Sequence, residues 1–66
     1  MNTAYFTFGQ DHVRSVDGFT YDKDVVVRID ADDPRLVMRQ TFGQRWAMQY
    51  DECPDLKYYP RGVKQL

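Results

Sequence analysis

The sequence predicts a single α+β domain over residues 1–66, with one helix packed on one face of a three- to four-stranded, mainly antiparallel sheet and a small hairpin arm. Three observations predict this fold. Two segments, residues 3–8 and 24–30, are apolar and rich in residues that favour β-strands. One segment, residues 33–43, carries capping residues at both ends of a helical pattern. An Asp-Gly pair between apolar residues is typical of a tight hairpin.

Both strand segments are rich in β-branched and aromatic residues. The first, TAYFTF, spans residues 3–8, and the second, DVVVRID, spans residues 24–30. Because side chains alternate between the two faces of a strand, every second one shares a face. One face of the two strands carries Ala4, Phe6, Phe8, Val25, Val27 and Ile29.

The chain between these strands contains the hairpin signal VRSV-DG-FTY. Asp-Gly suits a type I′ turn, which requires positive φ at both central residues. We therefore expect residues 13–16 and 19–21 to pair around Asp17 and Gly18 as a small arm.

The helix has a marked beginning and end. Asp33 suits the N-cap and Pro34 the first helical position. Gly43 suits the left-handed conformation that follows a last helical turn. Met38 and Phe42 are four residues apart and give the helix its core-facing side.

After the helix, RWAMQY over residues 45–50 returns to the two-residue period, and the tail LKYYP over residues 56–60 is expected to form a short edge strand that ends at Pro60. The expected core consists of Phe6, Phe8, Val25, Val27, Ile29, Val37, Met38, Phe42, Trp46 and Met48. The opposite sheet face, which has no second helix to cover it, is expected around Tyr5, Val26, Arg28, Ala47 and Gln49.

The tetrapeptide Thr-Phe-Gly-Gln occurs twice, starting at Thr7 and at Thr41. The residues that flank the two copies do not match, whereas true repeats share a whole structural unit. We therefore expect two separate local roles. Gly9 turns the chain after a strand and Gly43 ends the helix, in both cases because glycine adopts positive φ at little cost.

Composition excludes several classes of protein. Hydrophobic residues make up 42% of the chain and aromatic residues 15%, which is too rich for a disordered chain. A single cysteine, Cys53, excludes an internal disulfide and a cysteine-based zinc site, and it fits a reducing compartment. We expect no signal peptide and no membrane span. The net charge of −1 excludes a strongly basic nucleic-acid binder.

Acidic residues are expected to gather at one end of the domain. If segments 24–30 and 45–50 join one sheet through the helix, they run parallel and their C-terminal ends meet at one edge. The helix begins at the same edge. The acidic residues expected there are Asp30, Asp32, Asp33, Asp51, Glu52 and Asp55.

This acidic end has three interpretations. Surface acids mostly serve solubility and helix capping, as Asp33 does. Alternatively, an acidic patch engages a basic groove on another protein, where that partner would hold nucleic acid. A divalent-metal site is the third interpretation, but the run DADDP lacks the EF-hand spacing, so we expect no metal.

Catalytic motifs are absent from the sequence, so we expect neither an enzyme nor a cofactor. His12 is the only histidine, and Cys53 lies among acids that oppose thiolate formation. No glycine-rich phosphate loop, nucleophile elbow or Cys-x-x-Cys motif occurs. Tyr58, Tyr59 and Lys57 could stack on bases or simply close a small core.

The segments YFTFGQDH, VVVRIDA and FGQRWAMQYDE together resemble a family of small phage- and prophage-encoded proteins. The resemblance extends over nearly the whole chain. Small phage proteins of this size include many anti-CRISPR inhibitors, which act by binding, some of them as DNA mimics with acidic surfaces. The resemblance implies a monomeric inhibitor that binds a bacterial CRISPR-Cas defence protein stoichiometrically in the cytoplasm of the host cell. The partner-binding residues expected are Asp30, Asp32, Asp51, Glu52 and Asp55.

The chain departs from the most acidic DNA mimics, because nine Lys and Arg residues nearly balance its ten acids. Two other classes therefore remain open. One is a small nucleic-acid-binding protein that uses Arg35, Arg39 and Arg45 or the open sheet face. The other is a structural or regulatory phage subunit. A continuous acidic face would favour the inhibitor, and a basic stripe would favour nucleic-acid binding.

Overall fold

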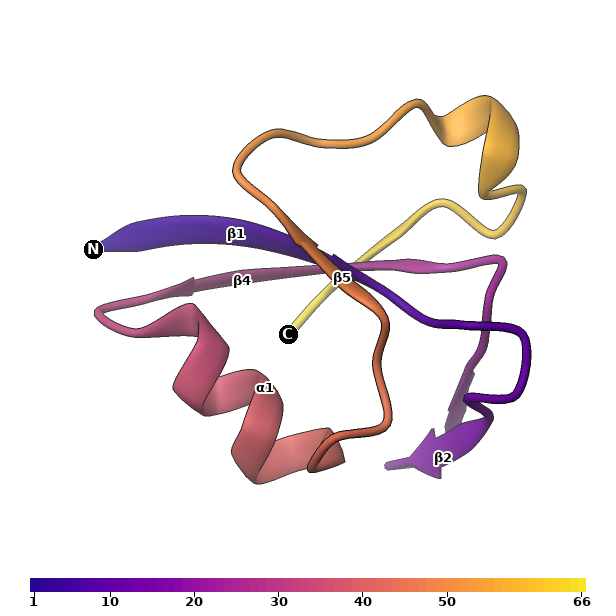
Figure 1. Cartoon of the computed structure of the whole chain (residues 1–66), viewed down its shortest axis with the longest axis horizontal. Helices are drawn as coiled ribbons and strands as arrows, with labels where there is room; N and C mark the ends of the chain where they lie inside the picture. Colours follow the sequence, from indigo (N-terminus) through magenta and orange to yellow (C-terminus); the bar gives the residue numbers. More distant parts are fainter.

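The computed structural model describes residues 1–66 and has the predicted α+β architecture (Figure 1). A mixed four-stranded sheet, a two-stranded hairpin and one α-helix make up the fold. The elements in chain order are β1 (Asn2–Thr7), β2 (Arg14–Val16), β3 (Phe19–Tyr21), β4 (Val26–Ala31), α1 (Pro34–Phe42), β5 (Met48–Tyr50), a 3-10 helix (Leu56–Tyr58) and β6 (Val63–Gln65).

The strand order of the main sheet is β5-β1-β4-β6. β1 and β4 form its centre and pair antiparallel from Asn2 opposite Ala31 to Thr7 opposite Val26. β5 pairs antiparallel with β1, and β6 pairs parallel with β4. β4 and β5 therefore run in the same direction, as predicted, but β1 lies between them.

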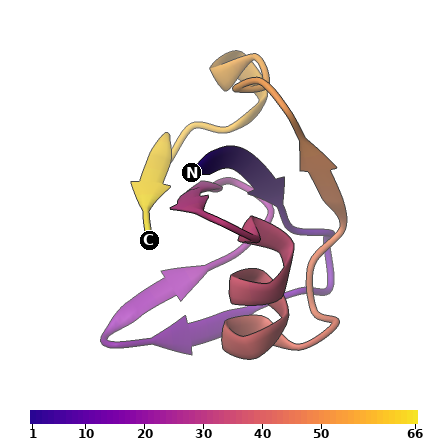
Figure 2. The ribbon, with the colours of Figure 1, turned by 90° about the vertical axis from the view of Figure 1, so that its left-hand side faces the viewer.

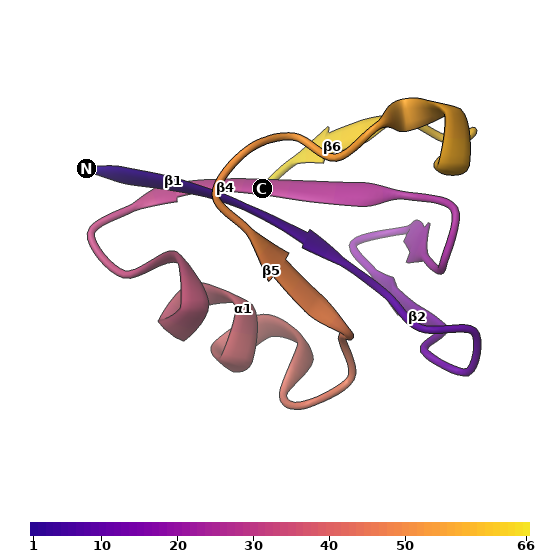
Figure 3. The same cartoon turned by 45° about the horizontal axis from the view of Figure 1, so that its top comes forward.

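The helix packs on one face of this sheet and encloses the core (Figure 3). Seven of the ten expected core residues are buried: Phe6, Phe8, Val25, Val27, Ile29, Met38 and Phe42. Val37 and Trp46 are partly buried against them. The hairpin contributes Tyr21 to the core, where its ring centroid lies 4.9 Å from that of Phe42 and 5.9 Å from that of Phe8.

Both ends of α1 are confirmed. The Asp33 carboxylate accepts a hydrogen bond from the Leu36 N–H at 3.2 Å, and Pro34 occupies the first turn. Gly43 has a φ of +66° and its N–H donates to the Arg39 carbonyl at 2.8 Å. At nine residues, α1 is too short and too polar to cross a membrane.

The hairpin arm is also confirmed, with Val16 opposite Phe19 in the closing pair. Asp17 and Gly18 have φ values of +53° and +79°, as a type I′ turn requires. The arm lies at the end of the sheet where β1 ends and β4 begins (Figures 1 and 3).

The predicted register of residues 45–50 is wrong. β5 contains only residues 48–50, and Gln49 lies opposite Phe6 on the helix side of the sheet, so Met48 points to the other face and is 53% exposed. Trp46 lies before the strand and reaches the core from a loop. A shift of one residue exchanges the two faces of a strand, which explains why a single misplaced boundary reversed this segment.

The tail prediction is wrong as well. Residues 56–58 form a 3-10 helix because the Asp55 carboxylate caps it through the Lys57 N–H at 3.0 Å. The edge strand instead follows Gly62, whose φ of +77° turns the chain back along β4.

The second face of the sheet is not fully open, in contrast to the prediction. The 3-10 helix and α1 lie on opposite sides of the sheet (Figure 2). Thr7 and Val26, which point to that second face, are only 3% and 0% exposed. The N–H of Val26 donates to the Gly62 carbonyl at 2.9 Å, which holds the tail against β4 at this point.

The two copies of Thr-Phe-Gly-Gln do have different roles, but the reason given for Gly9 is wrong. Gly9 has no positive φ. Its N–H donates to Nδ1 of His12 at 2.8 Å, and a Cβ at this position would lie 3.0 Å from the same atom. Glycine is therefore required by the close approach of the imidazole ring.

Candidate functional site

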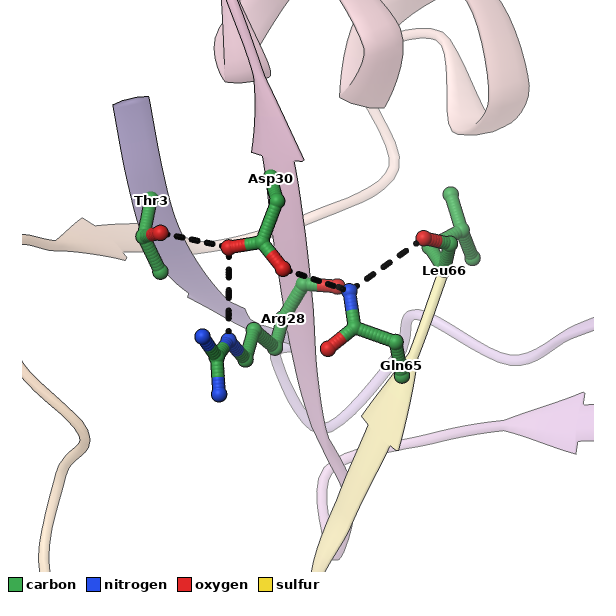
Figure 4. A network of polar contacts seen from close by, with 5 residues as sticks. All are labelled: Thr3, Arg28, Asp30, Gln65 and Leu66. Carbon is green, nitrogen blue, oxygen red and sulfur yellow. Dashed lines mark hydrogen bonds and ion pairs between the residues drawn. The ribbon is translucent and has the colours of Figure 1, made fainter. Parts of the chain in front are cut away.

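Asp30, near the end of β4, lies in a polar network on the sheet face opposite α1 (Figure 4). Its carboxylate accepts hydrogen bonds from the Thr3 hydroxyl, from Nε of Arg28 at 3.4 Å and from Nε2 of Gln65 at 3.3 Å. The Thr3 hydrogen bond and the Arg28 guanidinium hold the pKa of Asp30 below its ordinary value, although partial burial opposes them. The network joins three strands, and the negative charge is already compensated within the chain.

Asp32 and Asp33 follow β4 in the short loop that leads into α1. The Asp32 side chain is exposed and makes no ion pair, while its backbone carbonyl accepts a hydrogen bond from Nδ2 of Asn2 at 2.9 Å. Asp33 is used as the helix cap. Of these two acids, only Asp32 is free to meet a partner.

Asp51 and Glu52 follow β5, and both are exposed and without an ion pair. Cys53 beside them is an exposed free thiol that donates to the Pro54 carbonyl at 3.5 Å. Because β5 ends at Tyr50, Asp51 and Glu52 lie where the chain leaves the sheet.

Asp55 does not join the other acids, which corrects the expected convergence. It begins the 3-10 helix, and the turn after this helix lies against the residues before β4, because the Arg61 N–H donates to the Asp24 carbonyl at 3.0 Å. Figure 1 shows the 3-10 helix at the opposite end of the sheet from the start of α1. The Asp55 carboxylate also forms an ion pair with Nζ of Lys57 at 3.7 Å. The tail recrosses the sheet after β5, which the sequence pattern did not indicate.

The basic residues fall into two groups. Ion pairs with nearby carboxylates engage Lys23, Arg28, Lys57 and Arg61. No ion pair engages Arg14, Arg35, Arg39, Arg45 or Lys64. Lys64 lies 5.2 Å from the centre of the Phe19 ring, which also contacts Arg61 at 4.9 Å. These contacts tie the hairpin arm to the C-terminal strand.

Two of the unpaired arginines line a surface cleft of about 400 Å³ that runs along one side of α1 and past its C-terminal end. Its lining residues are Arg35, Arg39, Gly43, Gln44, Trp46 and Ala47. The guanidinium carbon of Arg35 lies 5.2 Å from the centre of the Trp46 ring. Nε1 of Trp46 donates to the Gly43 carbonyl at 3.1 Å, which fixes the indole against the helix end.

Sequence reasoning found the arginines of this cleft but not the cleft itself. The signal that could have predicted the cleft is the sequence spacing of Arg35 and Arg39 and of Gly43 and Trp46. Arg35 and Arg39 are four residues apart and so share one side of the helix. A glycine cap three residues before a tryptophan then folds the indole back toward that side.

The remaining reactive groups have structural roles. Nδ1 of His12 accepts from the Gly9 N–H, and burial raises the pKa of both Tyr21 and Tyr59. Tyr58 is 68% exposed beneath Nζ of Lys57 at 5.0 Å. No group of three or more His, Cys, Asp or Glu side chains is arranged to hold a metal ion.

Comparison of this chain with protein-family models, with curated proteins and with solved structures finds no match.

Proposed function

We propose that this protein acts by stoichiometric binding, as a monomeric inhibitor of a bacterial defence complex of the anti-CRISPR kind. The observation that carries the proposal is the set of exposed, unpaired acids at Asp32, Asp51 and Glu52. Exposed carboxylates without internal partners are available to a Lys- or Arg-rich groove on another protein. The phage-like sequence pattern supplies the biological setting of this proposal, the cytoplasm of a bacterial host.

Asp30 and Asp55 belong to the expected partner-binding set but contribute less. Each already has a cation of the chain beside its carboxylate, Arg28 at 3.4 Å and Lys57 at 3.7 Å. A partner would have to compete with these ion pairs. We therefore assign the initial attraction to the three unpaired acids.

Complementary charge acts mainly on the rate of encounter. Added salt shortens the range of this attraction, since the Debye length falls from about 10 Å at 0.1 M to about 3 Å at 1 M ionic strength. The proposal therefore expects association with the target to slow as salt is added, while dissociation changes little.

The test begins with the purified protein as bait in a lysate of the host, which identifies the target by mass spectrometry. Association rates with the purified target are then compared for wild type and for Asp51→Asn/Glu52→Gln. Asp11→Lys is the matched control, because it changes the net charge by the same amount at another exposed, unpaired acid.

We expect the double variant to associate roughly tenfold more slowly and the control to associate nearly as fast as wild type. Equal association rates for wild type and the double variant would show that these acids are only solvated surface. Equal loss in both variants would show that net charge, and not this surface, determines binding.

A further inference from the structure

The cleft along α1 differs in charge from the acidic surface. We infer that it binds a nucleotide, with the phosphate held by Arg35 and Arg39 and the base stacked against the aromatic and guanidinium surface around Trp46. The inference does not rest on the proposed function, because the cleft is lined by basic side chains and contains none of the proposed partner-binding acids.

The charges of the two cleft arginines are not neutralised within the chain. Like charges four residues apart on a helix repel each other, and the chain places no carboxylate beside either one. Arg39 does complement the helix dipole in the last turn, but Arg35 lies in the first. A pair of uncompensated guanidinium groups on one helix side is the arrangement that an anion neutralises.

The Arg35 guanidinium is held in place before any ligand arrives. Its central carbon lies 5.2 Å from the centre of the Trp46 ring, and that ring is itself fixed by the hydrogen bond to Gly43 and by edge-on packing on Phe6. A planar guanidinium offers paired N–H donors that match phosphate oxygens. Prior ordering reduces the conformational entropy that binding would otherwise remove.

A backbone donor without an acceptor also belongs to a residue of the cleft lining. The N–H of Gln44, at the cleft, donates to no group within the chain. The carbonyls at the end of α1 oppose an anion with a partial charge of about −0.5, which two guanidinium charges outweigh.

The size and the aromatic wall of the cleft favour a nucleotide over a bare anion. The volume of about 400 Å³ lies within the range of small-molecule sites, about 300–1,000 Å³. Inorganic phosphate would leave most of it empty. Bases stack on aromatic rings and on arginine planes, and both surfaces are present here.

Trp46 is the only tryptophan of the chain, so its fluorescence reports directly on the cleft. The experiment titrates the full chain with AMP, adenosine, inorganic phosphate and oligo(dA), and calorimetry checks each affinity. We expect AMP to quench the fluorescence more strongly than adenosine or phosphate. If oligo(dA) binds more tightly than AMP, the ligand is a nucleotide within a single strand. If the two bind equally, the ligand is a free nucleotide.

Single substitutions then locate the site. Arg35→Gln and Arg39→Gln should each weaken AMP binding about tenfold, because hydrogen bonds to charged groups contribute about that much to affinity. Arg14→Gln removes the same charge from the exposed hairpin and should leave binding unchanged. Arg35→Lys keeps the charge but not the paired donors, and it should weaken binding several-fold. Melting temperatures confirm that each variant is folded.

Three results would overturn the inference. Inorganic phosphate binding as tightly as AMP would show a simple oxyanion site. Poly-glutamate binding as tightly as oligo(dA) of the same length would assign the cleft to acidic protein. An Arg14→Gln variant as weak as Arg35→Gln would show that binding follows net charge and not this cleft.

Discussion

The indole of Trp46 meets the ring of Phe6 edge-on, with ring centroids 5.2 Å apart and planes inclined at 86°. This contact fastens the loop before β5 to a fully buried residue of β1. It also fixes the wall of the cleft, because the same indole lies beneath Arg35. A single half-buried side chain thus joins the core to the candidate site.

Trp46→Ala should lower the free energy of unfolding by about 2 kcal/mol, less than the roughly 3–5 kcal/mol of a fully buried aromatic, since the residue is only partly buried. Urea unfolding followed by circular dichroism measures the loss. Trp46→Phe is the control, because it keeps an aromatic ring against Phe6 while it loses the hydrogen bond to Gly43 and part of the ring area. A loss as large for Phe as for Ala would show that the hydrogen bond, and not ring packing, dominates.

Local signals predicted most of the fold. Asp33 and Gly43 mark helix ends through contacts with residues only a few positions away, and Asp17-Gly18 sets its turn through its own φ values. Such short-range rules act whatever the rest of the chain does. For the same reason the β-forming residues of segment 24–30 located most of β4, and they placed Val25, Val27 and Ile29 correctly in the core, although Val26 on the other face is buried as well.

The errors arose where contacts between distant segments decide the structure. β5 takes its register from pairing with β1, and the position of the tail depends on backbone hydrogen bonds such as that from the Val26 N–H to the Gly62 carbonyl. Neither contact leaves a local pattern in the sequence. The course of the tail also separates Asp55 from the other acids. The candidate acidic surface could therefore be predicted only in part.

Gly9→Ala should destabilise the protein by about 1–2 kcal/mol, because its Cβ would lie 3.0 Å from Nδ1 of His12 and force the ring to move. His12→Ala alone should cost about 1 kcal/mol through the lost hydrogen bond. In the double variant Gly9→Ala/His12→Ala the crowding disappears. The loss of unfolding free energy in the double variant should therefore be smaller than the sum of the losses in the two single variants. Additive losses in a double-mutant cycle of unfolding free energies would contradict this account of Gly9.

Gly18→Val should destabilise the hairpin turn by about 1–2 kcal/mol, because a β-branched residue is strained at a φ of +79°. Amide hydrogen exchange should accelerate across residues 14–21 more than in β1 and β4. Asp17→Asn is the control, since asparagine tolerates the left-handed conformation and should leave exchange almost unchanged. Unchanged protection of the hairpin amides in Gly18→Val would count against the type I′ turn.

The Thr3–Asp30 contact makes part of the stability depend on pH. Because the folded-state pKa of Asp30 is lowered, first by the Thr3 hydroxyl, its ionised carboxylate stabilises the fold above the unfolded pKa of about 4. That stabilisation is lost as the pH falls through the folded pKa. Thr3→Val should therefore raise the pKa of Asp30, which NMR titration of its carboxyl carbon measures directly.

The same variant should melt below wild type at about pH 7, and the difference should shrink as the pH falls through the folded pKa of Asp30, below which the carboxyl is protonated in both proteins. Thr20→Val is the control, because its hydroxyl is bonded only to that of Ser15, at 3.0 Å, and lies away from any carboxylate of the network. It should show no comparable pH dependence. A melting-temperature difference between Thr3→Val and wild type that stays constant over this range would mean that Thr3 acts through packing and not through the charge of Asp30.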